Sequence, residues 1–145
     1  MLLHAFVCFI YKRLGMPIPE VNEESKYDFI VDEHWAVSIY VQQKHFVIQA
    51  KVGKPLSPAH EEENRNLLMN LLDFKLKTMR VMDEVVCLDK DTQQLYCRKF
   101  LDPETLNEKN AWEVFDDFLV NIEIIEERFF EEKPTQERMN PDFLL

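Results

Sequence analysis

Apolar and polar residues alternate along the stretch from Tyr27 to Val52. The alternation falls into three runs, each rich in β-branched and aromatic residues, which are separated by polar corners at 32–34 and 42–45. Such alternation is typical of half-buried strands, and corners of this length join antiparallel neighbours. The pattern therefore predicts a three-stranded antiparallel meander. Its second face also carries bulky or apolar side chains, and we expect another protein to cover them: Ile30, Ala36, Tyr40 and Val47.

Helical spacing of apolar residues predicts three helices around this meander. The first covers 2–14 and ends at Gly15, the second runs from about Pro58 to Arg80, and the third from about 106 to 131. The first helix is apolar on more than half of its circumference, so we expect it to be buried on two sides, by its own core or by a partner. The outward side of the third helix is predicted to be acidic: Glu113, Asp116, Asp117, Glu123, Glu126 and Glu127.

A second strand unit is predicted between the last two helices. Val85–Leu88 and Leu95–Leu101 form the arms of a hairpin, with a polar turn at 89–92. The order of elements is helix, three-strand antiparallel meander, helix, two-strand hairpin, helix, which indicates a single α+β domain over residues 1–132. Residues 133–145 contain two prolines and no periodicity, and we expect them to form a mobile tail.

Charge and cysteine content narrow the range of partners. The chain of 145 residues has a net charge of -10. Residues 1–80 carry ten acidic and ten basic residues, whereas 81–145 carry seventeen acidic and seven basic ones. This imbalance argues against nucleic acid or an anionic membrane as a partner. Three cysteines without a CxxC pair are interpreted as small core residues, which suits a reducing compartment: Cys8, Cys87 and Cys97.

No pattern for an enzyme or a cofactor is visible. Two glycines in the whole chain are too few for a phosphate-binding loop. The four histidines form no metal-ligand motif, and the carboxylates of the third helix are interpreted as a solvated face. The apolar run at 2–11 lacks a preceding basic region and a small-residue cleavage site, so we do not interpret it as a signal peptide, and it is too short to span a bilayer.

Several segments resemble the class I type III secretion chaperones of Gram-negative bacteria, the effector-specific, Tir-chaperone-like group. They are the opening helix LLHAFVCFIYKRLGMP, the meander with FIVDEHWAVSIYV and HFVIQAKVG, the helix NLLMNLLDFKL and the hairpin VVCLDKDTQQLYCRKFL. The long last helix with Trp112 and Phe118 completes the resemblance, which covers residues 2 to about 131. One departure is the first hairpin corner at 32–34, where the family usually has a glycine and this chain has none.

The resemblance implies a homodimer in the bacterial cytoplasm that binds the N-terminal segment of one or more secreted effectors in extended form, without ATP. It also suggests the secretion-apparatus ATPase as a further partner. Effector contacts would come from six residues: Leu2, Phe6, Phe9, Ile30, Tyr40 and Val47. The dimer interface would come from four others: Leu72, Phe74, Val85 and Cys87. For every one of these residues, packing within the chain's own core is the competing interpretation.

Two other functions remain open from the sequence. The first is a regulatory protein–protein interaction module on the same scaffold, either an anti-activator or a partner that sequesters a chaperone. The second is a small enzyme, which would require a pocket with convergent polar groups.

Overall fold

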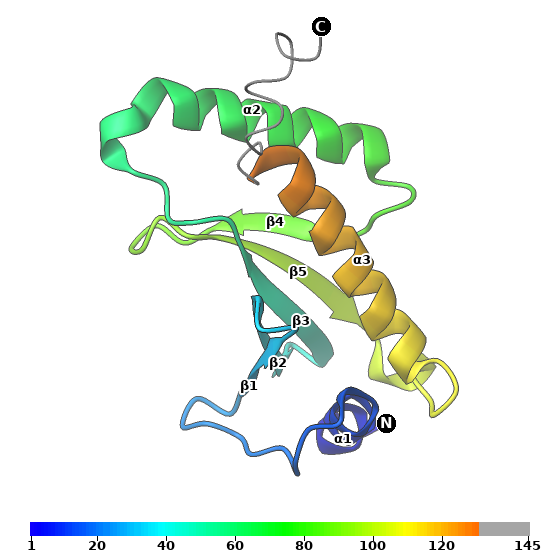
Figure 1. Cartoon of the computed structure of the whole chain (residues 1–145). Helices are drawn as coiled ribbons and strands as arrows, with labels where there is room; N and C mark the ends of the chain where they lie inside the picture. The colour runs from blue at the N-terminus through cyan, green and yellow to red at the C-terminus, as the bar shows by residue number, and fades with distance from the viewer. Residues whose placement is uncertain (131–145) are drawn as a thin grey trace, which may run out of the picture.

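The computed structural model describes residues 1–130, and Figure 1 shows their arrangement. Three α-helices and five strands follow the predicted order. The helices are α1 (Leu3–Leu14), α2 (Glu61–Thr78) and α3 (Ala111–Phe129). The strands are β1 (Tyr27–Val31), β2 (Trp35–Gln42), β3 (His45–Val52), β4 (Val85–Leu88) and β5 (Leu95–Leu101). Single 3₁₀ turns precede α2 at Pro58–His60 and α3 at Pro103–Thr105. The α+β class and the single-domain architecture are thus confirmed. The predicted tail, 133–145, lies outside the described residues.

The meander and the hairpin form one antiparallel sheet with the strand order β1-β2-β3-β5-β4. Pairing of β3 with β5, from Phe46 opposite Leu101 to Val52 opposite Leu95, joins the two units. In this order β1 and β4 are the edge strands of the sheet. Among the described residues, the backbone N–H and C=O groups on the outer side of each edge strand have no strand neighbour.

One face of this sheet carries the core. Alternate residues of each strand point to that face, and α1 and α3 cover it. Phe6 of α1 packs against Phe46 with ring centroids 5.7 Å apart, and Tyr11 meets Phe29 edge-on at 4.9 Å. From α3, Phe115 and other fully buried side chains fill the space above the strands. The buried residues of α1 are Phe6, Val7, Ile10 and Tyr11, and all four belong to the chain's own core. The core therefore accounts for much of the burial expected for the first helix.

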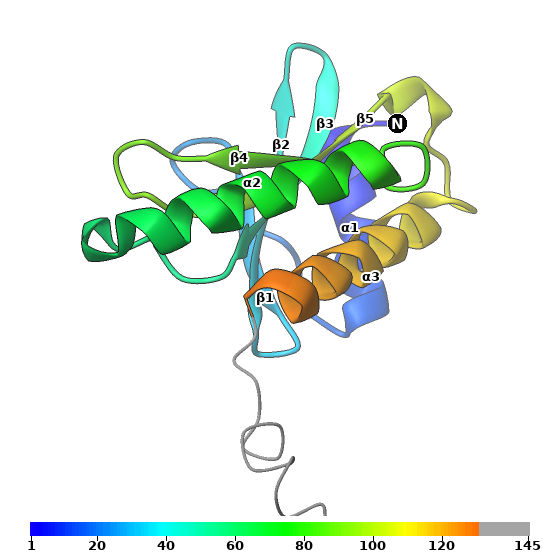
Figure 2. The same cartoon turned by 90° about the horizontal axis from the view of Figure 1, so that it is seen from above.

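The α2 helix is attached much more loosely. It crosses above β4 and β5 beside the end of α3, as Figures 1 and 2 show. Leu71 is its single buried residue. Phe74 meets Phe129 of α3 with ring centroids 5.3 Å apart, and the guanidinium of Arg128 lies over the Phe74 ring. The start of α2 carries Glu residues and its end Lys residues, as the helix dipole favours.

Glu126 departs from the predicted acidic outer side of the last helix. Its carboxylate accepts hydrogen bonds from Trp35 Nε1 at 2.9 Å and from the Gly53 N–H at 3.3 Å, and it lies 2.6 Å from His34 Nε2. The assignment of Glu126 to the solvent side was therefore wrong. The physical reason is that this carboxylate satisfies polar donors of β2 and of the chain after β3 at the edge of the core.

The glycine-free first hairpin corner closes with unusual backbone angles. Asp32 and Glu33 have φ values of 53° and 56°, in the left-handed region that glycine adopts most easily. Asp tolerates this region better than most residues because its short side chain bonds locally. The corner predicted at 32–34 therefore forms without the glycine that the family usually has there.

Candidate protein-docking site

An apolar groove of about 520 Å³ lies between α2 and β4. Leucine and methionine side chains of α2 form one wall, and the chain from Met82 to Leu88 forms the other. The lining comprises Leu68, Leu71, Leu72, Lys75, Leu76, Met79, Met82, Asp83, Glu84, Val85, Val86, Leu88 and Leu95. Contiguous exposed apolar surface of this kind marks protein-interaction sites in soluble proteins.

The outer edge of α2 carries an exposed apolar stripe, which we call the α2 stripe. Its members are Met69, Leu72, Leu76 and Met79, all of them exposed, with Leu72 at 61 %. They follow one another at intervals of three, four and three residues. This is the spacing that presents a continuous seam to a second helix in knobs-into-holes packing. The α2 stripe therefore has the form of a helix–helix contact that no helix within residues 1–130 fills.

Beneath the groove lies a buried carboxylate. Glu84 is 1 % exposed, and its Oε2 atom accepts a hydrogen bond from Asn121 Nδ2 at 2.8 Å. Lys99 Nζ is 3.8 Å from the same oxygen and 2.7 Å from Asp83 Oδ1. Within the described residues, Oε1 of Glu84 has no hydrogen-bond partner. A buried carboxylate oxygen without a donor carries a desolvation cost.

The four residues predicted for the dimer interface separate into two pairs. Leu72 and Val85 line the groove and are exposed. Phe74 faces α3, where it packs on Phe129, and Cys87 is half-buried outside the groove lining. The groove thus brings together the first two residues but not the last two.

The six residues predicted to contact an effector occupy very different places. Leu2 and Ile30 are 80 % and 64 % exposed, and Phe9 is half-buried against the core. Phe6 and Val47 are completely buried, and Tyr40 is almost so. In this subunit Phe6, Val47 and Tyr40 therefore present almost no surface to an effector.

Local packing explains the burial of Tyr40 and Val47 on the second face of the sheet. The two lie opposite each other across β2 and β3, and Phe100 of β5 is opposite Val47 on its other side. Lys26 Nζ lies 4.7 Å from the centre of the Tyr40 ring, and the Tyr40 hydroxyl donates to Gln49 Oε1 at 3.0 Å. The side chains of Tyr40 and Val47 are thus covered by each other and by their neighbours on the second face.

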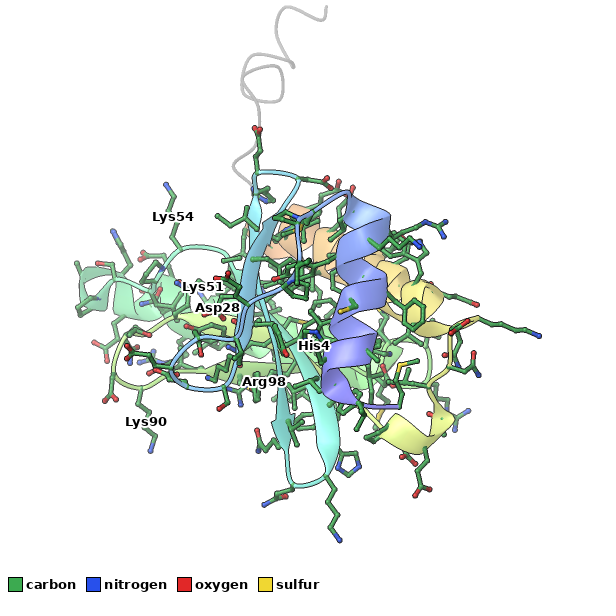
Figure 3. The ribbon with its side chains drawn as sticks, turned by 90° about the horizontal axis from the view of Figure 1, so that it is seen from below. His4, Asp28, Lys51, Lys54, Lys90 and Arg98 are labelled. Atoms are coloured by element: carbon green, nitrogen blue, oxygen red, sulfur yellow. The ribbon has the colours of Figure 1, made fainter. Side chains whose placement is uncertain are left out.

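The rest of the second face is polar. A hollow of about 230 Å³ lies there, with Asp28, Ser38, Gln49 and Lys51 in its lining. Arg98 Nε donates to Gln49 Oε1 at 2.7 Å. Figure 3 shows Asp28 and Lys51 close together on the sheet, with Arg98 nearby. Much of the face expected to be covered by another protein is thus hydrogen-bonded and hydrophilic.

Reactive groups give no indication of catalysis. Burial raises the pKa of the Cys97 thiol to about 12, so this thiol stays protonated and unreactive near neutrality. Burial also raises the pKa of Tyr40. Among residues 1–130, no three or more His, Cys, Asp or Glu side chains are grouped so that they could hold a metal ion. Over the same part of the chain, no helix has the length and apolarity needed to cross a bilayer.

One feature of the groove and one of the α2 stripe were not found from the sequence. Glu84 stands in the run VMDEVVCL next to the exposed Asp83, and the sequence alone does not show which of the two acids is buried. Met69 is the other feature. It shares the spacing of Leu72, Leu76 and Met79, which places the four on one side of the helix but does not show whether that side is exposed.

Comparisons with known proteins identify the family. The family model of the Tir chaperone protein (CesT) family matches residues 9–123, which is most of the chain. The chain therefore belongs to this family, and its general role is that of a type III secretion chaperone. No curated protein matches the chain.

Solved structures share the fold at low sequence identity. The ExsC-ExsE complex matches with a TM-score of 0.71 and 15 % identity, over 90 % of this chain and 95 % of that chain. The HopA1-SchA chaperone-effector complex matches with 0.61 and 14 %, over 87 % and 91 %. The Yersinia pestis type III secretion chaperone SycH, in complex with a stable fragment of YscM2, matches with 0.55 and 15 %, over 83 % and 97 %.

Proposed function

We propose that this protein is a homodimeric chaperone of the bacterial cytoplasm, which binds the N-terminal segment of one or more secreted effectors in extended form and keeps them competent for type III secretion. Membership of the Tir chaperone family supports the general role. Similar folds occur in complexes whose descriptions name a chaperone with an effector or with a protein fragment. The two glycines of the chain, Gly15 and Gly53, stand too far apart for a phosphate-binding loop, which supports binding without ATP.

The single observation that carries the proposal is the unfilled apolar surface of α2 and β4. Exposed large apolar residues gather there, on the α2 stripe and at Val81, Val85 and Leu88. A second copy can cover this surface by placing its own α2 stripe along the first, because a two-fold contact uses the same patch on both subunits. We assign this surface to the homodimer and keep Leu72 and Val85 in the interface.

We assign effector binding to the opposite edge of the sheet. Within residues 1–130 no strand pairs with the outer side of β1, so an extended segment could add a strand there by backbone hydrogen bonds. Ile30 projects from β1 and is exposed, and Leu2 is exposed at the start of α1. These two side chains, with the exposed part of Phe9, are the apolar contacts that we retain for an effector.

The experiment is purification of the chain from its native bacterium, followed by identification of co-purifying effectors and by titration with their N-terminal segments. We expect one or more effectors to bind through that segment in the absence of ATP. The matched variants are Ile30→Asp, on the β1 edge, and Val120→Asp, an exposed residue of α3. Ile30→Asp is expected to weaken effector binding at least tenfold, and Val120→Asp to leave it within about threefold. Effector binding that ignores both substitutions would contradict the β1 assignment.

Light scattering tests the homodimer separately. A mass of twice 17.4 kDa is expected at micromolar concentration. A monodisperse monomer that still binds effectors would contradict the proposed homodimer but not the chaperone role.

A regulatory interaction module is the second candidate, and the acidic outer side of α3 favours it. Glu113, Asp116, Asp117, Glu123 and Glu127 are all exposed there. Reversal of Glu123 and Glu127 to Lys tests this surface without disturbing Glu126, which is engaged with β2. Loss of a native partner in this variant, with apolar effector binding retained, would favour the regulatory function.

A further inference from the structure

Acidic residues gather around β1. Residues 20–33 carry six acidic residues and one basic residue, so their formal net charge is -5. The rest of the stretch 1–80 carries four acidic and nine basic residues. The negative charge of this half of the chain is therefore concentrated at one edge of the sheet.

Two fixed turns hold acidic side chains at the ends of β1. Before the strand, the side chain of Asn22 accepts hydrogen bonds from the N–H groups of Glu24 and Lys26 at 2.8 and 2.9 Å. After the strand, the left-handed backbone of Asp32 and Glu33 makes the corner to β2. The acidic residues of both turns are exposed, and we call them the edge acids: Glu23, Glu24, Asp32 and Glu33. They flank a strand of five residues, which is about 16 Å long.

The one basic residue of this region compensates the edge acids only in part. Lys26 Nζ lies 4.7 Å from the centre of the Tyr40 ring and 3.7 Å from Glu24 Oε2. Such an exposed ion pair is weak. In the part of the chain that the structure describes, the other three edge acids make no ion pair. Both ends of β1 therefore present negative charge to a segment that arrives at this edge.

Between the edge acids, β1 presents backbone groups and an apolar side chain. No strand within residues 1–130 pairs with its outer side. Ile30 is 64 % exposed, and Val21, which precedes the turn at Asn22, is 52 % exposed. A strand added beside β1 would place every second side chain next to Ile30 or its neighbours on the same face. The edge thus combines an apolar centre with acidic ends.

We propose that the effector segment which pairs with β1 is basic: it carries lysine or arginine near both ends of the strand that it adds, and an apolar residue beside Ile30. The inference rests on the effector site of the proposed function and adds the chemistry of its ligand. Opposite charges at both ends favour this segment, whereas an acidic segment meets like charges at both ends and is rejected.

Three synthetic peptides test the charge preference on the full chain. All share an extended core in which valine and threonine alternate, and each end carries two lysines, two glutamines or two glutamates. In titration calorimetry at low salt, the lysine peptide is expected to bind at least about tenfold more tightly than the glutamine peptide, because several weak ion pairs add. The glutamate peptide is expected to bind most weakly. Salt at about 0.5 M is expected to reduce the tenfold preference to less than about threefold by screening.

Neutralising the edge acids tests whether they cause this preference. The variant combines four substitutions: Glu23→Gln, Glu24→Gln, Asp32→Asn and Glu33→Gln. Its fold is expected to stay intact, because the side chains are exposed and Asn adopts the left-handed region as Asp does. In this variant the lysine and glutamine peptides are expected to bind within about threefold of each other.

A matched control separates the edge from the overall charge of the chain. It neutralises four exposed acids of α2 and of the region around the start of α3: Glu62→Gln, Glu108→Gln, Glu113→Gln and Asp117→Asn. The control has the same net charge as the edge variant. It is expected to keep at least about a fivefold preference for the lysine peptide.

Hydrogen exchange and a proline peptide test strand addition apart from charge. The lysine peptide is expected to slow amide exchange in residues 27–31 and not in α3. Replacement of the central valine of the peptide by proline removes a backbone donor, and the binding constant is expected to fall at least about tenfold.

Four outcomes overturn the inference. The lysine peptide shows no binding, the glutamate peptide binds as tightly as the lysine peptide, the edge variant keeps the preference, or the control loses it as fully as the edge variant does. In each case, effector binding that still depends on Ile30 would leave the proposed function in place. Effector binding that does not depend on Ile30 would instead contradict the β1 assignment on which the inference rests.

Discussion

The helices α1 and α2 are both amphipathic, yet they differ in how far the rest of the subunit buries their apolar residues. The twelve residues of α1 bury four side chains completely or nearly so, namely Phe6, Val7, Ile10 and Tyr11. The eighteen residues of α2 bury Leu71 alone, while four apolar side chains of its stripe remain exposed. The number of apolar residues in a helix therefore does not say what the helix covers. We interpret α1 as part of the subunit core and α2 as part of an interface.

The largest expected effect is on the α1 side of this comparison. Phe6→Ala removes a completely buried ring that packs on Phe46 and leaves a cavity. The free energy of unfolding is expected to fall by about 3–5 kcal/mol. Urea denaturation of the subunit checks this value. A decrease in the free energy of unfolding below about 1 kcal/mol, together with impaired effector binding, would instead indicate that Phe6 contacts an effector.

The second effect belongs to α2. Leu72→Asp combined with Leu76→Asp places two charges on the exposed stripe. In the proposed homodimer, the dissociation constant is expected to rise more than about 100-fold, because each leucine would lose its burial against the second copy. Sedimentation measures this change, and circular dichroism is expected to show an intact fold. Unfolding of the variant would instead show that the stripe stabilises the subunit.

A smaller effect is expected at the carboxylate that connects α3 with the strands. Glu126→Gln keeps the shape of the side chain but removes the charge that Trp35, His34 and Gly53 share. The free energy of unfolding is expected to fall by about 1–3 kcal/mol. Glu127→Gln, at an exposed neighbouring position, is the control and is expected to stay within about 0.5 kcal/mol. Trp35 fluorescence during denaturation follows both variants.

The smallest effect concerns alkaline pH. Burial raises the pKa of Cys97 from 9.0 to about 12 in the folded chain. Above pH 9 the unfolded chain releases this proton while the folded chain keeps it, so stability falls as the pH rises, by about 1.4 kcal/mol per pH unit. Below pH 9 the thiol contributes no pH dependence. The slope is measured as the difference between the unaltered chain and Cys97→Ala. Equal slopes between pH 9 and 11 would contradict this prediction.

The sequence predicted the elements well because their patterns are local. Val85–Leu88 and Leu95–Leu101 are confirmed with the predicted bounds, and the first helix differs by one residue at its start. The last helix begins later than predicted, at Ala111, because Pro103–Thr105 forms a separate 3₁₀ turn. Pairing of β3 with β5 joins segments far apart in the sequence, and no local pattern predicts which strands will be neighbours.

The candidate site was harder to predict than the fold. The family resemblance gave interface roles to Leu72 and Ile30, which are exposed, but it gave the same kind of role to Phe6 and Val47, which are completely buried. Period-based reasoning shows which residues share a face, not what lies against that face. Burial of a charged side chain such as Glu84 also depends on Asn121 and Lys99, which come from other elements. These relations exist only once the chain is folded.

The contact between α1 and α3 has a consequence for folding during synthesis on the ribosome. The first helix and the segment 111–129 cover the same face of the sheet. Strands β1 to β3 are therefore synthesised well before the helix α3 that completes the cover of their apolar face. Until α3 is synthesised, the apolar face of the meander is only partly covered. Translation runs at about 5–20 residues per second, so the growing chain spends several seconds with this apolar face partly exposed. The chain itself must therefore pass through a short period in which the apolar face of its own sheet is open to aggregation.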